Sequence, residues 1–150
     1  MSKTAAPSKP FTLRAYRPED YPAILALWQY TRQRPYRPEQ IERVLRSEGG
    51  VLVAEGVLPN GDKAVAGVLI WSHNGQVGHL WRVAVAAEFR RQGVASALIH
   101  QAEADIRASG LDGVGLLTRI LNSAAQSLYV KLGYRHREDL IFWSKRFDGE

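Results

Sequence analysis

The segment from Arg90 to Ala95 has the residue types expected of a pyrophosphate-binding site. It reads Arg-Arg-Gln-Gly-Val-Ala and opens a stretch with helical periodicity that ends before Gly110. Gly93 and the small Ala95 let the backbone approach a ligand closely. A helix beginning here directs unpaired N–H groups and its positive dipole end outward, beside two arginines. This arrangement suits a diphosphate, although a plain strand-to-helix turn with solvated arginines explains the same residues.

Other phosphate and thiol chemistries are excluded by what the sequence lacks. It contains no Gly-Lys-Ser/Thr of a Walker loop and no Gly-x-Gly-x-x-Gly dinucleotide fingerprint. It also contains no cysteine, which excludes a disulfide framework, a thiolate zinc site and a cysteine nucleophile. We expect no metal cofactor.

The elements that position this segment follow from hydrophobic periodicity and turn signals. Strands are predicted at 11–16, 51–55, 64–72, 76–85, 114–121 and 140–143, and helices at 21–33, 39–47, 93–109 and 123–133. Ser123 to Gln126 reads as a capping box that opens the last helix. The order predicts a single α/β (α+β) domain over 11–147, in which an antiparallel meander continues into βαβ-like crossovers. Residues 1–10 are polar and carry two prolines, so they are predicted to be a disordered tail.

Charge and hydropathy limit the partners. The 150 residues carry a net charge of +5, which favours a polyanionic partner: nucleic acid, a membrane surface or a nucleotide cofactor. The basic residues form no block of five or six, so a nucleic acid is the less favoured partner. No apolar run approaches the ~20 residues of a membrane span, and the first ten residues lack the apolar core of a secretory signal. We expect a cytoplasmic protein.

Two blocks of the sequence resemble the GNAT superfamily of N-acetyltransferases, and Leu27-Trp28 followed by Arg34-Pro35 resembles a bacterial subgroup of its small, uncharacterised members. Arg90-x-x-Gly93-x-Ala95 is similar to the pyrophosphate loop of that family, Arg/Gln-x-x-Gly-x-Gly/Ala. The block from Asn122 to Tyr134 is similar to its Asn-x-x-Ala-x-x-Leu-Tyr-x-x-Leu-Gly-Phe/Tyr signature. The two blocks stand in the family's order and separation, and the resemblance covers residues 11–147.

The resemblance implies a direct transfer of an acetyl group from acetyl-CoA to a primary amine of a small molecule or peptide. It also implies a mixed, mostly antiparallel sheet flanked by helices, whose fourth and fifth strands splay apart so that the pantetheine arm pairs with the fourth. An amide N–H on that strand would stabilise the oxyanion. The cofactor-binding residues implied are Val83, Ala84, Val85, Arg90, Arg91, Gln92, Gly93, Val94, Ala95, Ser96, Asn122 and Tyr129.

The resemblance also suggests catalytic residues. Tyr129 matches the family's general acid, which protonates the departing thiolate; it also fits as a core residue beside Leu128. Asn122 matches a cofactor-contacting asparagine and fits equally as a helix N-cap. Several relatives have a glutamate where this chain has Leu117, so the general base is open.

His79 is the first candidate for that base, because strand alternation places it on one face with Trp81, Val83 and Val85. Glu55 and His73 are further candidates. A strand histidine with a satisfied hydrogen bond explains His79 as well.

The acceptor site of the family lies at the first two helices and their connection. Arg32, Arg34 and Arg37 in that connection could bind an acidic group of the acceptor, or form a solvated surface. The chain continues only to residue 150 after Gly133, so we expect one main strand there, or its exchange with a partner subunit in a homodimer.

Three alternative functions remain open at this point. The first is a protein N-terminal or lysine acetyltransferase, which shares the chemistry and differs in the acceptor. The second is a non-catalytic module that binds CoA. The third is a nucleic-acid binder, which would be retained on DNA in a salt-dependent way and would be indifferent to CoA.

Overall fold

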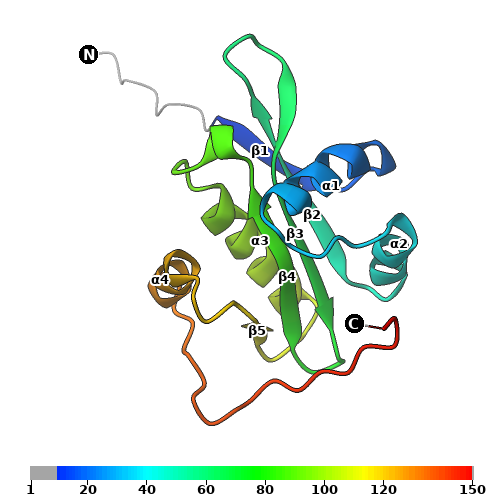
Figure 1. Cartoon of the computed structure of the whole chain (residues 1–150), viewed down its shortest axis with the longest axis vertical. Coiled ribbons are helices and arrows are strands. Elements are labelled where there is room, and N and C mark those ends of the chain that lie inside the picture. The colour runs from blue at the N-terminus through cyan, green and yellow to red at the C-terminus, as the bar shows by residue number, and fades with distance from the viewer. Residues whose placement is uncertain (1–9, 150) are drawn as a thin grey trace. The chain divides into compact units, whose positions relative to one another are not determined.

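The computed structural model describes residues 10–149 (Figure 1). The predicted tail over 1–10 lies outside the described residues except for Pro10. In chain order the elements are β1 (Phe11–Ala15), the 3-10 turn η1 (Pro18–Asp20), α1 (Tyr21–Tyr30), α2 (Pro38–Arg46), β2 (Gly50–Val57), β3 (Lys63–His73), β4 (Gly78–Val85), the 3-10 turn η2 (Ala87–Phe89), α3 (Val94–Ala108), β5 (Val114–Leu116) and α4 (Ser123–Lys131).

The strands form one mixed sheet in the order β1-β2-β3-β4-β5. The first four are antiparallel neighbours, and β5 returns parallel to β4 after the crossover through α3. This confirms the predicted α/β fold with a mostly antiparallel sheet. The β4–β5 pairing ends at Leu80 and Leu116, so the rest of β4 has a strand neighbour only on its β3 side within the described residues. The fourth and fifth strands therefore separate as expected.

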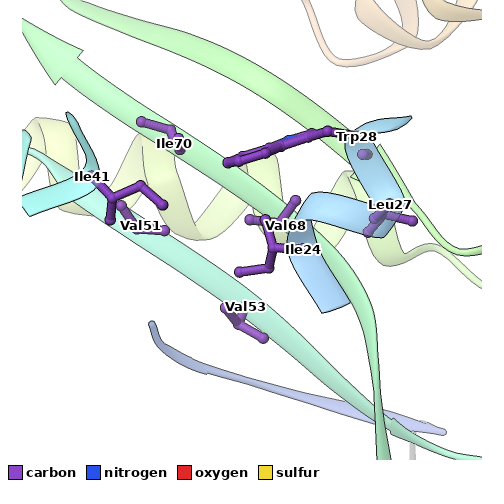
Figure 2. Packing of buried hydrophobic residues seen from close by; sticks show 9 residues of the cluster. Ile24, Leu27, Trp28, Ile41, Val51, Val53, Val68 and Ile70 are labelled. Carbon is purple, nitrogen blue, oxygen red and sulfur yellow. The ribbon is translucent and has the colours of Figure 1, made fainter. Parts of the chain in front are cut away.

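Helices cover both faces of the sheet. On one face, α3 packs so closely on β3 that a Cβ added to Gly67 would lie 2.8 Å from Cγ1 of Val94. On the other face, α1 and α2 contribute Ile24, Trp28 and Ile41 to a buried cluster with β2 and β3, shown in Figure 2. Burying each such side chain contributes about 1.5–3 kcal/mol. The packed sheet thus supports the loop that joins the end of β4 to the start of α3.

The chain divides into two compact units, the first ending at Leu117 and the second beginning at Thr118. The second contains α4, none of whose residues is buried. From Arg135 to Gly149 the second unit has neither helix nor strand. The large apolar side chains of this segment are exposed, including Phe142 (67%) and Trp143 (85%).

Two strand predictions are wrong for a shared reason. The strand predicted at 140–143 does not form, and the one predicted at 114–121 ends at Leu116. Leu117, Ile120 and Leu121 are exposed rather than buried. A strand is stable only where a neighbouring strand takes up its backbone hydrogen bonds, and within the described residues no strand pairs with 117–121 or with 140–143.

Three further differences from the predicted elements have local causes. The helix predicted at 21–33 ends at Tyr30, because Arg32 adopts a left-handed conformation (φ 58°). The strand predicted from Gln76 starts at Gly78, because the Asn74 side chain accepts hydrogen bonds from two amides of the preceding turn. The capping box predicted from Ser123 is replaced by a cap at Asn122, since Gln126 donates instead to carbonyls upstream of the helix. In the described part of the chain, no helix has the length and apolar character needed to cross a membrane.

Candidate active site

The loop before α3 is anchored by η2. Phe89 is 4% exposed and packs on β2, where a Cβ added to Gly56 would lie 2.3 Å from its ring. The backbone then passes through Arg90 in extended conformation and through two left-handed residues, Arg91 (φ 61°) and Gly93 (φ 80°). Only a residue without a Cβ adopts the left-handed conformation at no steric cost, which accounts for glycine at 93. The loop is therefore a tight reversal fixed to the sheet at its start.

The start of α3 leaves its first amides open. Its first intrahelical bond runs from Ala97 N to Gly93 O at 3.0 Å, so Val94, Ala95 and Ser96 have no intrahelical acceptor. Gly93 has no side chain with which to cap them. Nothing in the described part of the chain lies within 4 Å of a Cβ built on Gly93, so the space beside this residue, at the start of α3, is open there. The residues thus fit the diphosphate predicted from the sequence.

The side chains around this loop differ in role. The Arg90 guanidinium lies over the Tyr30 ring of α1, 5.4 Å from its centroid. Gln92 donates to the Glu88 carbonyl at 3.3 Å and closes the loop on η2, whereas Arg91 is exposed. Arg91 therefore projects into solvent beside the open amides, and Arg90 is held by an aromatic ring.

A β-bulge interrupts β4 at the point where β5 has ended. Trp81 pairs with Ile70 and Ala84 with Val68, so Arg82 and Val83 together oppose the single residue Leu69. Arg82 has a left-handed backbone (φ 57°). Bulges of this kind are frequent beside active sites, where they redirect backbone groups.

The bulge overturns one expectation about β4. Trp81 and Ala84 lie on the face covered by α1 and α2, whereas Val85 pairs with Gly67 on the face covered by α3. The prediction that His79, Trp81, Val83 and Val85 share one face is therefore wrong, because the extra residue reverses the alternation. His79 shares its face with Trp81 and Ala84.

His79 lies between β3 and β5, opposite Ser72 and Gly115. Its ring meets Trp81 edge-on at 5.5 Å, and a Cβ on Gly115 would come within 3.0 Å of it. Glycine at 115 therefore makes room for the imidazole. The Nδ1 atom is buried and has no hydrogen-bond partner in residues 10–149, so a strand histidine with a satisfied hydrogen bond does not describe this atom.

The other two candidate bases have structural partners. Glu55 accepts from Arg14 Nε at 3.1 Å and lies 3.8 Å from the Lys63 ammonium. The Nδ1 atom of His73 accepts from the Gly75 amide at 3.0 Å and so stabilises the β3–β4 turn. Both side chains are accounted for by the fold. Across residues 10–149, no three His, Cys, Asp or Glu side chains gather as a metal site would require.

The second unit carries Asn122 and Tyr129. Asn122 accepts from the Ala125 amide at 3.1 Å and caps α4, so the N-cap alternative is confirmed. Its side-chain NH₂ is not used in that bond. Tyr129 packs edge-on against Tyr134 at 5.9 Å, and burial raises the pKa of its hydroxyl above the ordinary value. The phenol of Tyr129 therefore holds its proton at neutral pH.

The connection between α1 and α2 reaches the bulge, which sequence reasoning missed. Gln33 Nε2 donates to the Val83 carbonyl at 3.0 Å, and the Arg82 guanidinium lies over the Tyr36 ring at 5.5 Å. The detectable signal is Arg82 itself, a charged residue within an otherwise apolar stretch of β4. Of the three arginines predicted near the acceptor, Arg37 is paired with Glu39 at 2.7 Å.

Comparison with known proteins gives a consistent result. The model of the Acetyltransferase (GNAT) family matches residues 12–134. An acetyltransferase of Sodalis glossinidius (strain morsitans) is 28% identical over 137 residues, covering 89% of this chain and 94% of that protein. AAC(6')-Iy, solved in complex with the bisubstrate analog CoA-S-monomethyl-acetylneamine, has a TM-score of 0.70 at 21% identity over 91% of this chain and 98% of its own.

A further solved structure has the same fold. Glucosamine-6-phosphate N-acetyltransferase from Arabidopsis thaliana has a TM-score of 0.68 at 19% identity over 92% of this chain and 99% of its own. The family match spans most of the chain and includes both motif blocks. This protein belongs to the Acetyltransferase (GNAT) family.

Proposed function

We propose that this protein transfers an acetyl group from acetyl-CoA to a primary amine of a small molecule or peptide, by direct attack of the amine on the thioester. The observation that carries the proposal is the uncapped start of α3 behind the left-handed Gly93. A helix N-terminus with open amides and no side-chain cap is suited to a diphosphate, the group that joins the two halves of CoA.

The donor binds through backbone groups in this proposal. Its diphosphate accepts hydrogen bonds from the backbone N–H groups of the loop and of the first turn of α3, residues 91–96. The arginines at 90 and 91 add positive charge. The pantetheine arm pairs along β4 beyond Leu80, where no strand of the described chain occupies the β5 side. The net charge of +5 draws a polyanionic cosubstrate toward the protein.

The chemical step needs one bond formed, one bond broken and two proton movements. The amine nitrogen attacks the carbonyl carbon of the thioester, the C–N bond forms, and the C–S bond breaks as the thiolate leaves. Tyr129 donates its phenolic proton to that thiolate through a hydrogen bond; burial raises the pKa of this phenol, so the proton is present when the thiolate leaves. His79 accepts the proton lost by the amine, directly or through a water molecule.

The acceptor is proposed to be an amine because of the relatives that share the fold. One is an N-acetyltransferase of glucosamine 6-phosphate, and another was solved with an analog that joins CoA to acetylneamine. Peptide or protein amines are the alternative acceptors. A panel containing neamine, glucosamine 6-phosphate and a short peptide with a free N-terminus separates the two classes by turnover. The cytoplasm is the compartment in which we expect the reaction.

A second candidate function is a non-catalytic module that binds CoA. The observation in its favour is Leu117, an exposed apolar residue at the position where the resemblance to the family leads us to look for a glutamate base. The amine panel decides between them, since a binding module takes up acetyl-CoA and produces no thiol above the uncatalysed rate with any amine.

The proposal is tested by titrating CoA into the wild type and two glycine variants, with calorimetric detection. Gly93 and Gly110 flank α3, both are left-handed (φ 80° and 81°), and neither has an atom within 4 Å of a built Cβ in the described chain. Gly93→Ala and Gly110→Ala therefore introduce the same backbone strain, about 1–2 kcal/mol. Only Gly93→Ala places its methyl group at the start of α3, beside the open amides.

We expect CoA to bind the wild type and Gly110→Ala alike and Gly93→Ala at least about tenfold more weakly, or ~1.4 kcal/mol. Similar melting temperatures for the two variants would show that the strain is matched. An absence of binding heat with the wild type overturns the proposal. Equal affinities of all three proteins would remove the start of α3 from the site.

A further inference from the structure

The bulge in β4 is strained, and its position is unusual. Four non-glycine residues have positive φ in the described chain, and Arg82 is the one that lies within a strand. A left-handed non-glycine residue costs on the order of 1–3 kcal/mol and persists only where its surroundings hold it. The surroundings of Arg82 are therefore informative.

Two side chains from α1 and the residues after it hold the carbonyls of the bulge. Trp28 Nε1 donates to the Arg82 carbonyl at 3.1 Å, and Gln33 Nε2 donates to the Val83 carbonyl at 3.0 Å. Trp28 is fully buried in the core shown in Figure 2, so its indole is a fixed donor. The two consecutive carbonyls are thus bound from the same segment of the chain.

Gln33 is itself fixed in place. Its amide N–H donates to the Trp28 carbonyl at 2.8 Å, and its Nε2 also donates to Thr31 Oγ1 at 3.0 Å. Thr31 in turn donates to the Leu27 carbonyl at 2.9 Å, on the last turn of α1. A side chain held at several points loses little further entropy on binding Val83, which suits it to orient a backbone group.

The bulge also holds the connection in return. Arg82 Nε donates to the Arg34 carbonyl at 2.7 Å, and its guanidinium lies over the Tyr36 ring. Tyr36 packs against Trp28 with centroids 6.0 Å apart, and its own carbonyl accepts from the Tyr21 hydroxyl at 2.8 Å. The connection between α1 and α2 and the bulge in β4 therefore form one hydrogen-bonded assembly.

Peptide geometry links these bonds to the thioester site. In a trans peptide the N–H points opposite to the carbonyl, and the described chain has no cis peptide bond. Holding the Arg82 carbonyl therefore sets the direction of the Val83 N–H, and the bond from Gln33 holds the carbonyl of that same residue. Arg82 and Val83 lie on the stretch of β4 along which the proposed function places the acetyl-pantetheine arm.

We infer that Gln33 is a positioning residue, which orients the β4 bulge so that a backbone N–H donates to the thioester carbonyl. The inference rests on the proposed function. Gln33 touches neither the acetyl group nor the acceptor; it acts through the Val83 carbonyl. Donors set in advance toward a developing oxyanion lower the barrier because they need no reorganisation during the reaction.

The test compares Gln33→Ala and the isosteric Gln33→Glu with Gln29→Ala and Gln29→Glu. Gln29 lies on α1, is exposed, and makes no side-chain hydrogen bond in the described chain. The probe is acetyl-CoA with an isotopically labelled acetyl carbonyl, whose stretching band is recorded by infrared difference spectroscopy in the bound state. Turnover is measured with the best amine of the panel, and binding by calorimetry with CoA.

We expect the labelled band to shift to lower frequency on binding to the wild type and to both Gln29 variants, and to lose most of that shift in both Gln33 variants. The value of kcat should fall about tenfold in the Gln33 variants, less than for removal of a direct donor. KM for acetyl-CoA and the affinity for CoA should change less than about twofold, because the open amides of α3 are untouched.

The outcomes separate the inference from the proposed function. If the wild type does not bind CoA, both the proposed function and the inference that rests on it are wrong. If the wild type binds and turns over while the Gln33 variants match the Gln29 variants in band position and kcat, the inference alone is wrong. A Gln33 variant that loses CoA affinity in parallel with kcat also overturns it, since that pattern indicates general loss of structure.

Discussion

The starts of α3 and α4 both fall in motif blocks, and they satisfy their first amides in opposite ways. At α4 the Asn122 side chain accepts from the Ala125 amide, so one of the free donors is bound within the protein. At α3 the corresponding position is Gly93, which has no side-chain acceptor and no described atom within 4 Å of a Cβ built on it. The two sites therefore have different chemistry although both are helix N-termini.

The difference shows which kind of group each site contributes. An uncapped start binds through the backbone, so its side chains can vary as long as the glycine is kept. At the capped start one amide is bound within the protein, and in the proposed function α4 acts through side chains, the Asn122 amide and the Tyr129 hydroxyl. In the proposed function, phosphate binding therefore belongs to α3 and proton transfer to α4.

Tyr129→Phe tests the proposed role of α4 and has the largest expected effect, which is on kcat. Loss of the phenolic proton should lower kcat about 100-fold, as for removal of a general acid, and leave the affinity for CoA within about twofold. Because burial raises the pKa of Tyr129, the wild-type kcat should not decline through tyrosine ionisation until the pH exceeds ~10. Steady-state kinetics across pH and calorimetry with CoA measure both quantities.

Tyr134→Phe is the matched control, because it removes a hydroxyl from the ring packed against Tyr129. It should leave kcat near the wild-type value. Equal losses of kcat in the two variants would assign the effect to packing and remove Tyr129 from the chemistry.

The start of α1 provides a third case, in which the residue before the helix is a buried carboxylate. Asp20 accepts two hydrogen bonds from the Arg14 guanidinium at 2.8 Å, and the bond to Arg14 lowers the pKa of Asp20. A lowered folded-state pKa contributes stability that is present above ~3.9, the unfolded value, and is lost as the pH falls through the folded value.

We expect Asp20→Asn to lower the free energy of unfolding by about 2 kcal/mol at pH 7, the scale of hydrogen bonds to charged groups. The difference in free energy of unfolding between the wild type and the variant should become smaller as the pH is lowered below ~3.9. Urea unfolding at several pH values measures this, with Asp112→Asn as an exposed control. A difference independent of pH would contradict the electrostatic origin.

Asn122 caps α4 and is also proposed to contact CoA, and two substitutions separate these roles. Asn122→Ala removes the cap and should destabilise α4 by about 1 kcal/mol, whereas Asn122→Asp keeps an acceptor for the Ala125 amide. Both remove the side-chain NH₂ donor, so both should weaken CoA binding by about fivefold, the value of one hydrogen bond. Hydrogen exchange of the α4 amides and calorimetry report the two effects.

If Asn122→Asp binds CoA as the wild type does, the side chain serves only as a cap. Weaker binding by Asn122→Ala alone would then be explained by fraying of α4.

Arg91 gives the smallest expected effect, because an exposed charge beside a backbone site adds little. Arg91→Ala should weaken CoA binding about two- to threefold at low salt and less at high salt. Arg107→Ala is the control, since Arg107 is an exposed arginine at the other end of α3. If Arg91→Ala loses as much affinity for CoA as Gly93→Ala does, a side chain and not the backbone binds the phosphate.

The first unit could be predicted well from sequence because its signals are local. The turn at Asn74 and Gly75, the apolar strands and the glycine before α3 each determine their own neighbourhood, and the observed sheet follows. The segment at 140–143 failed as a prediction because strand pattern alone supplies no partner for the backbone.

The bulge at Arg82 was missed for a related reason. Strand alternation predicts one face for His79 and Val85, and one extra residue opposite Leu69 reverses it. The donors that hold the bulge, Trp28 and Gln33, lie some fifty positions earlier in the chain. Contacts across such a separation leave no local pattern, so the sequence predicts the loop before α3 but not the geometry of β4.

The exposure of Trp143 allows the second unit to be followed by tryptophan fluorescence in solution. Trp28 and Trp71 are buried, whereas Trp143 is 85% exposed. Its indole should emit at long wavelength and be quenched by iodide, unlike the two core indoles. Any event that covers the segment around it, whether ligand binding or self-association, should shift that emission to shorter wavelength and protect it from the quencher. The native chain therefore contains its own fluorescent reporter, and replacing Trp143 with Phe gives the blank.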